Sequence, residues 1–341
     1  MWLWISILIL TQAEAKQKIA APVDLGRIQH DSLGVKSTEE AETLWREGQK
    51  SFREGNFLES ARLIQRFIAR YPSDPNFTEA HFLLGQSLQA MGEHHEALAP
   101  LRFYAEAFPV SEAGWNAKLK LAESYIGMKK YHQASALGAE VFKRTSVQGH
   151  ATNAEFSVHG LLTQSLAQAH LNHRVKSQAL LDSAVERIKI YYSEENLPPA
   201  VAGHIQSTRT AVGILQCQEF KIRRRALDEG QTREFLRRHA LCLVNAGTEL
   251  KKTLEAKELY WINQATQNYT QAIQNFREEC TQLPQPPGHR KPKQAQQFFN
   301  EIKEIQRKDC TQHLADIRGI FKSQSKQLEP LLKVLERALP E

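Results

Sequence analysis

Side chains that could perform chemistry are few in this sequence, and none of them falls into a catalytic pattern. His170 and His173 could place two imidazoles on one helix face if a helix extends that far, but no acidic or thiolate ligand adjoins them. The sequence contains no nucleophile elbow, no phosphate-binding glycine loop, no His-Glu-x-x-His motif and no acidic calcium loop. We therefore expect no catalytic residue, no metal site, no cofactor and no enzymatic activity.

The four cysteines are a second group with defined chemistry. Their spacing excludes the Cys-x-x-Cys pairs of zinc and thioredoxin sites. Cys217 and Cys242 are nearly equidistant from Gly230, so an antiparallel helical hairpin that turns at Gly230 would bring their side chains together. Elimination then pairs Cys280 with Cys310. Four reduced cysteines in a core are the alternative.

Basic side chains form a third group, because the excess of Lys and Arg behind the net charge of +6 lies in residues 197–341. The hairpin predicted at Gly230 would gather Lys221, Arg223, Arg224, Arg225, Arg237 and Arg238. Such a cluster suits anionic lipid headgroups, an acidic glycan or an acidic partner. The alternative is a solvated face neutralised by Glu219, Asp228, Glu229 and Glu234.

The N-terminus carries a targeting pattern. The apolar run Trp2 to Leu10 is shorter than the roughly 20 residues that span a bilayer, and Ala13-Glu14-Ala15 follows with the small-x-small spacing of a signal peptidase site. No Lys or Arg precedes the run, and a buried N-terminal strand or helix is the alternative. We expect a signal peptide over residues 1–15, a flexible linker over 16–38 and a soluble periplasmic or secreted protein. The cleavage site has no cysteine for a lipid anchor, and an exported chain has little use for nucleic acid.

The elements that must position these groups are helices, since Ala, Gln, Glu, Lys, Leu and Arg dominate and no strand-like alternation appears. The N-terminal half repeats at intervals of 37 residues, a period typical of stacked helical hairpins. The interval separates the small residues Gly48, Gly85 and Ala122, the turn residues Gly55, Gly92 and Lys129, and the prolines Pro72 and Pro109. A fourth, degenerate unit is expected from Gly160 to Tyr192, with Ala167 and Ala179 at its small positions and a spacing of 45 from the third.

This pattern resembles the tetratricopeptide repeat. With Ala41, Thr78 and Trp115 as first positions, small residues fall at position eight and prolines at position 32. The stretches RYPSD and AFPVS, and EAHFLLGQ after the first, are similar to the repeats of bacterial envelope proteins. Examples are the periplasmic cell-division coordinator of the Tol-Pal system and the repeat lipoprotein of the outer-membrane assembly machine.

The resemblance implies an all-α fold and a peptide-binding groove lined by the first helix of each repeat. It assigns to that groove Glu42, Trp45, Gln49, Phe52, Arg53, Glu79, Phe82, Gln86, Gln89, Asn116, Leu119 and Glu123. Aromatic rings would supply contact area, and amides would pair with a peptide backbone. Packing between neighbouring repeats is the alternative role for Trp45 and Phe82.

Beyond Pro198-Pro199 the period is lost and long helices are expected. We predict a helix from Ala200 to Leu227, a following helix capped by Thr232, a seam from Ile262 to Leu283, and a last helix from Phe298 to Leu335. The chain is thus predicted to be a repeat solenoid over residues 39–196 followed by a basic helical module over 197–341.

Its expected function is an exported scaffold that binds a protein or peptide partner in the bacterial envelope. One alternative is an envelope factor whose C-terminal module carries an enzymatic, glycan-binding or anionic-lipid-binding site. A cytosolic repeat adaptor with reduced cysteines is another.

Overall fold

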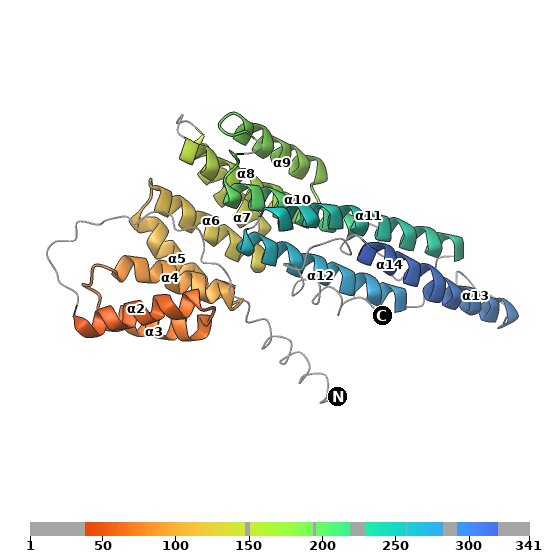
Figure 1. The fold of residues 1–341 in the computed structure, drawn as a ribbon, viewed down its shortest axis with the longest axis horizontal. Coiled ribbons are helices and arrows are strands. Elements are labelled where there is room, and N and C mark those ends of the chain that lie inside the picture. The colour runs from red at the N-terminus through yellow and green to blue at the C-terminus, as the bar shows by residue number, and fades with distance from the viewer. Residues whose placement is uncertain are drawn as a thin grey trace. The chain divides into compact units, whose positions relative to one another are not determined.

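The computed structural model describes residues 38–146, 151–193, 196–218, 229–256, 258–281 and 292–319. Within these ranges the secondary structure is helical and contains no strand (Figure 1). The predicted signal peptide and most of the linker lie outside the described residues. Among the described residues, no helix combines the length and the apolar character needed to cross a membrane.

The first part of the described chain is a series of helix pairs. The pairs are α2 (Glu39–Arg53) with α3 (Phe57–Arg70), α4 (Phe77–Ala90) with α5 (His94–Ala107), α6 (Glu112–Gly127) with α7 (Tyr131–Thr145), and α8 (Ala151–His170) with α9 (Arg174–Lys189). Local sequence sets where α2 and α6 begin: the Thr38 and Ser111 hydroxyls accept hydrogen bonds from the backbone N–H groups of Ala41 and Gly114.

The turn inside each pair has the backbone conformation that the repeat predicts. Gly55 and Gly92 adopt the left-handed region with φ of 76° and 84°, and Lys129 and Asn172 take the same place with φ of 59° and 63°. Only glycine adopts this region without a steric cost, so Lys129 is held there by the structure around it. These residues fix the register of the repeats at intervals of 37, 37 and 43 residues.

Small residues let the two helices of a pair approach closely. A side chain on Gly85 would place its Cβ 2.5 Å from Cγ of Leu101, and one on Gly48 would lie 2.5 Å from Cδ1 of Ile64. Leu101 and Ile64 are themselves fully buried, so they have little room to move. The arrangement is therefore a tetratricopeptide-type solenoid of three regular helix pairs and one degenerate pair.

The fourth pair corrects the expected register. Because its turn lies 43 residues after Lys129, the small positions fall on Ser165 and Ser177, and both are completely buried. Ala167 is buried, but Ala179, which the sequence analysis placed in the interface, is exposed. Serine therefore occupies the two small positions of the fourth pair. A pattern that requires Gly or Ala at these positions does not detect this repeat.

Helix α2 is the first helix of the described solenoid, and its outer face is polar. On α4, the residues that face the preceding pair are small or apolar, and Ser87 Oγ lies 3.0 Å from Ser60 Oγ of α3. The same positions on α2 carry charged residues, among them the exposed Glu47 and Lys50. Terminal repeats need such a polar face to remain in solution, so α2 acts as the cap.

Arg187 ties the end of α9 to the helices before it. Its guanidinium donates to the Ser146 carbonyl at the end of α7 (3.1 Å), donates to the Ser157 hydroxyl and lies over the Phe142 ring. A cation at a helix C-terminus is favoured by the helix dipole. Among the described residues, the first compact unit accordingly runs to Ala167 and also includes Glu186–Tyr191; the second holds Gln168–Val185 and the chain from Tyr192 onward.

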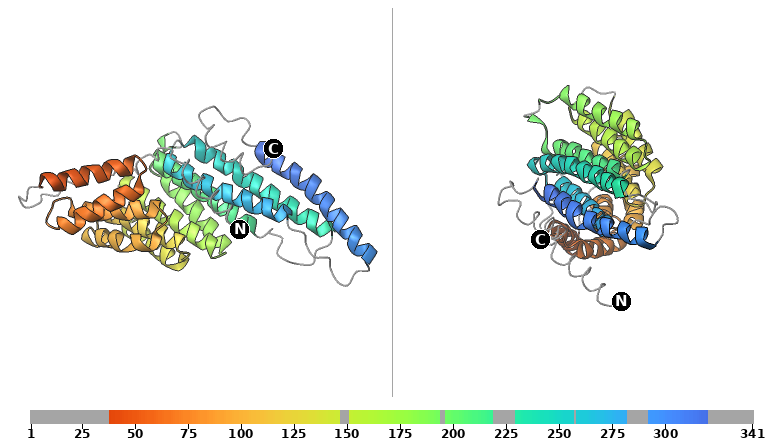
Figure 2. Two further views of the ribbon diagram at one scale, coloured as in Figure 1. Left: turned by 90° about the horizontal axis from the view of Figure 1, so that it is seen from below. Right: turned by 90° about the vertical axis from the view of Figure 1, so that its right-hand side faces the viewer.

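The second unit continues with long helices: α10 (Pro199–Cys217), α11 (Glu229–Glu255), α12 (Leu259–Thr281), α13 (Pro292–Ile305), the π-helix η3 (Gln306–Cys310) and α14 (Thr311–Gly319). Helices α10, α11 and α12 pack against one another, and α13 and α14 pack on α11 (Figure 2). The predicted seam is buried at Ile262, Tyr269 and Phe276. A domain boundary at residues 196–197 stays a prediction.

The turn between α10 and α11 is not at Gly230. Helix α11 already begins at Glu229, so Gly230 lies in its first turn and Thr232 is a buried helical residue rather than a cap. The described part of α10 ends at Cys217, and residues 219–228, which include Lys221 to Arg225, lie outside the described residues. The prediction that Cys217 and Cys242 face each other on antiparallel helices is therefore correct, although the predicted position of the turn is wrong.

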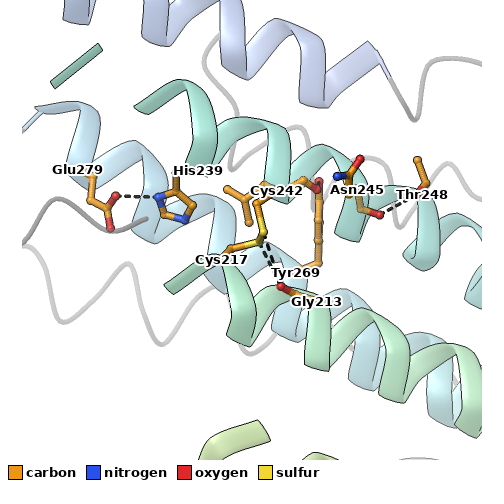
Figure 3. Close-up of a disulfide and its surroundings, with 9 residues drawn as sticks. Gly213, Cys217, His239, Cys242, Asn245, Thr248, Tyr269 and Glu279 are labelled. Carbon is orange, nitrogen blue, oxygen red and sulfur yellow. Dashed lines mark hydrogen bonds and ion pairs between the residues drawn. A yellow bond between two sulfur atoms is a disulfide. The ribbon is translucent and has the colours of Figure 1, made fainter. Parts of the chain in front are cut away.

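Two disulfides hold this unit together, and they join the pairs that the spacing predicts. Cys217 on α10 is bonded to Cys242 on α11, and Cys280 on α12 is bonded to Cys310 in η3, with Cα atoms 5.5 and 6.0 Å apart. Figure 3 shows the first bond at the face of α10 that carries Gly213. The buried Tyr269 nearby is satisfied, because its hydroxyl donates to the Leu243 carbonyl at 3.0 Å.

The π-helix η3 has a cause in the sequence. Buried residues on α13 and α14 follow a seven-residue rhythm, from Phe298 to Ile305 and from Cys310 to Ile317. The step between the two runs, from Ile305 to Cys310, is five residues, which one π turn accommodates. The π turn therefore keeps both runs on the core face and directs Cys310 toward Cys280.

Candidate functional site

The face formed by the first helix of each pair is the candidate site, because the four turn residues place its positions without ambiguity. Most of the predicted groove residues prove to be half-buried, and among them only Glu42 and Arg53 are exposed. The contacts of each residue show whether it packs within the fold or remains accessible to a partner.

On α2, the aromatic groove residues lean on their own helix pair and keep part of their surface. The Trp45 ring lies 5.9 Å from the Phe67 ring of α3, and the Phe52 ring lies 5.4 Å from that of Phe57 at the start of α3. Both remain half-buried. Since α2 is the first helix among the described residues, these rings and the exposed Glu42 and Arg53 form the most accessible part of the described face.

On α4, two predicted groove residues are joined to the second helix of their pair. The Tyr104 hydroxyl donates to both oxygens of the Glu79 carboxylate, at 2.9 and 3.0 Å, and its ring stacks on Phe82 at 4.7 Å. Burial, together with the Glu79 charge, raises the pKa of Tyr104. Phe82 and Glu79 therefore contribute to packing within their own pair, whereas the alternative interpretation placed Phe82 between neighbouring repeats.

An amide links neighbouring pairs. Gln89 Nε2 donates to the Lys120 carbonyl at 2.6 Å and to Ser124 Oγ at 2.7 Å, so this predicted groove residue joins α4 to α6. Gln86, one turn earlier on α4, is half-buried.

On α6, Leu119 is not available to a ligand. It is 7% exposed and packs in a cluster with Trp115, Val141 and Phe156. Its neighbour Glu123 forms an ion pair with Lys120 at 2.8 Å, and the Lys120 side chain is only 11% exposed. Asn116 is half-buried at the start of the helix.

His159 on α8 is a residue of this face that the sequence analysis missed. Burial, and to a lesser extent the positive charge of Lys120, lowers the pKa of His159 to about 4. It lies 43 residues after Asn116, which makes it the equivalent of Glu42, Glu79 and Asn116. A spacing of 45 residues would have pointed to Leu161 instead, so the wrong register concealed it.

The other predicted centres are less suited to binding. Helix α8 ends at His170, and His173 lies beyond the turn with its Nδ1 2.8 Å from Gln168 Oε1, so the two histidines do not share a helix face. The described residues contain no cluster of three or more potential metal ligands. The pair His239 and Glu279 is 2.9 Å apart but almost completely buried, out of reach of a substrate.

The described part of the basic cluster is paired with one local carboxylate. Arg237 and Arg238 are exposed and both donate to the Glu234 carboxylate, at 2.8 and 2.6 Å. These bonds lower the pKa of Glu234 to about 2. The contacts match the alternative of a solvated face with its own counter-ions.

Comparison with known proteins gives a limited result. No family model matches the chain, and no curated protein matches it. One similar solved structure is a tetratricopeptide repeat protein from Parabacteroides merdae. It is 10% identical in sequence with a TM-score of 0.42, and the match covers 88% of this chain and 100% of that one. Similarity at this level carries no information about function.

Proposed function

We propose that this chain is an exported scaffold that binds an extended segment of a protein partner along the first-helix face, and that it acts by binding rather than by catalysis. The proposal rests on the partly exposed aromatic side chains of α2. Trp45 and Phe52 keep exposed surface there, beside the exposed charges of Glu42 and Arg53. A few aromatic and arginine side chains commonly supply most of the affinity of a protein interface.

The expected place of action is the bacterial cell envelope. The apolar run before Ala13-Glu14-Ala15 supports export, and two disulfides are typical of proteins that fold in an oxidising compartment. Cleavage after Ala15 would leave Lys16 as the N-terminus, and mass spectrometry of the envelope fraction would detect it. An intact Met1 chain confined to the cytosol would contradict export.

The binding proposal is tested with exposed residues, so that the fold is not disturbed. A Glu42→Arg, Arg53→Glu variant reverses both charges on the candidate face. The matched control, Glu47→Arg with Lys50→Glu, makes the same exchange on the capping face of the same helix. Quantitative affinity purification from envelope extract should show partners that the first variant loses and the control retains.

Circular dichroism must show equal helix content in both variants. If both retain every partner, or both lose them equally, the first-helix face is not the binding surface. An anionic-lipid function is the weaker candidate, because Arg237 and Arg238 already share the Glu234 carboxylate, which offsets part of their charge.

A further inference from the structure

The outward face of α12 over residues 259–276 differs from the exposed helix surfaces around it because it lacks charge. Residues 259–276 contain no Asp, Glu, Lys or Arg. By contrast, α11 exposes Arg237, Arg238 and Lys252, and α13 exposes Lys303 and Glu304. Charged residues normally make up about a quarter to a third of a soluble surface, so a long exposed stretch without them calls for an explanation.

Amides form a straight stripe on this face. The residues Tyr260, Gln264, Gln267, Gln271 and Gln274 follow one another in steps of four and three, which places them on one side of the helix. The glutamines are exposed and Tyr260 is half-buried, while the opposite side carries the buried Ile262, Ala265, Tyr269, Ile273 and Phe276. At the rise of an α-helix the stripe is about 21 Å long.

Most of these amides have hydrogen-bonding capacity to spare. Gln271 Nε2 donates to Asn275 Oδ1 at 3.1 Å. Gln264, Gln267 and Gln274 make no hydrogen bond to another residue in the part of the chain that the structure describes. Each primary amide offers two donors and one acceptor oxygen, so the stripe presents both kinds of group in alternation along its length.

An aromatic pair stands at the N-terminal end of the stripe, and it is rigidly supported. The Trp261 ring stacks on His204 of α10 with centroids 3.8 Å apart and an angle of 6°, and the Tyr260 ring meets it edge-on at 4.8 Å. Gly203 makes room for this contact, because a Cβ there would lie 2.8 Å from Cδ1 of Trp261. Burial raises the pKa of the adjacent Glu258.

We propose that this face of α12, from Tyr260 to Gln274, binds a neutral glycan chain. Sugar hydroxyls both donate and accept hydrogen bonds, as the amides do, and the half-buried Tyr260 ring adds apolar surface with a hydroxyl at its edge. The lack of charge gives no attraction for an ionic polymer. A helical partner or a second copy of this chain is disfavoured, because the exposed part of the stripe beyond Tyr260 consists of amides and offers no apolar anchor to bury.

The test uses the whole mature chain and three defined probes: hexamers of β-1,4-linked glucose, of β-1,4-linked N-acetylglucosamine and of α-1,4-linked glucose. Isothermal titration calorimetry should detect binding of at least one hexamer, with an affinity that does not change between low and high salt. A Gln264→Ala, Gln267→Ala, Gln274→Ala variant should bind that hexamer about ten-fold more weakly or not at all.

Two features keep the test decisive. Alanine has a higher helix propensity than glutamine, so the variant should retain its helix content, which circular dichroism verifies. A Gln296→Ala, Gln297→Ala control removes exposed amides from α13 and should bind as the parent does.

Three results would overturn the proposal: no binding of any hexamer, equal binding by the α12 variant, or capture of a peptide or protein that the α12 substitutions abolish in its place. None of these results bears on the first-helix face of α2, so the two proposals stand or fall separately.

Discussion

The two units hold their helices together by different means. In the first, close approach depends on the absence of a side chain at fixed intervals, as at Gly85 against Leu101. In the second, helices of unequal length pack around one continuous buried core. The Cys217–Cys242 and Cys280–Cys310 bonds join helices that are not related by a sequence repeat. Helix contacts that recur at a fixed interval can therefore be predicted from the sequence. Contacts that do not recur could be predicted here only where a pair of cysteines marked them.

The largest effect that separates the units should come from removing a disulfide. A Cys217→Ser, Cys242→Ser variant loses a crosslink that spans 25 residues, and we expect about 3 kcal/mol less stability. The loss should be confined to α10–α14. Hydrogen exchange by mass spectrometry should show faster exchange there and unchanged exchange in α4–α7. Equal acceleration in both regions would contradict the separation.

A substitution at a small position should produce the reverse pattern. Gly85→Leu overpacks the contact with Leu101, and we expect a cost of about 1–3 kcal/mol or more. Exchange should accelerate in α4–α7 and remain unchanged in α11 and α12. Ala90→Leu, at an exposed position on the same helix, is the control. If both variants show the same urea midpoint, the assigned repeat register is wrong.

Acid should weaken the first unit through His159. Its pKa is lowered to about 4 in the folded chain, so below the unfolded value near 6.5 the unfolded chain binds the extra proton. The stability that depends on a neutral His159 is therefore fully present above about pH 6.5. It falls as the pH drops toward 4, and about 1–2 kcal/mol is lost at pH 5. His159→Gln should reduce this pH dependence in urea melts. An unchanged difference between pH 7 and pH 5 would exclude His159 as the cause.

The smallest effect concerns the turn of the third pair. Lys129 occupies a left-handed conformation that Gly55 and Gly92 adopt freely, so Lys129→Gly should stabilise the first unit by up to about 1 kcal/mol. Asn172→Gly should gain less, because asparagine tolerates this region better. Thermal melts of both variants would rank them, and a loss of stability in Lys129→Gly would show that its side chain contributes more than its backbone costs.

The sequence was sufficient where one residue decides local geometry. Gly55, Gly92 and the small positions Gly48 and Gly85 fix a turn or a close approach by themselves, so the repeat could be predicted from them. The fourth pair was misplaced by two residues because Ser165 and Ser177 serve where glycine or alanine was expected.

The site was harder to predict, because its residues depend on neighbours distant in sequence. Leu119 is covered by packing with Phe156 of a later helix pair, and Glu79 is held by Tyr104. Neither contact can be predicted from the spacing of the repeats in the sequence. The five-residue step from Ile305 to Cys310 was visible in the sequence, but its meaning as a π turn depends on the buried face that both runs share.

Binding of a partner along the first-helix face of the repeat unit is what the proposed function requires. It is tested most directly by placing a photo-activated crosslinking amino acid at Gln49, on that face of α2, and at Lys50, on its capping face, in cells that export the chain. We expect one defined crosslinked protein from Gln49 and none from Lys50. Equal products from both positions, or no product from Gln49, would contradict binding at this face.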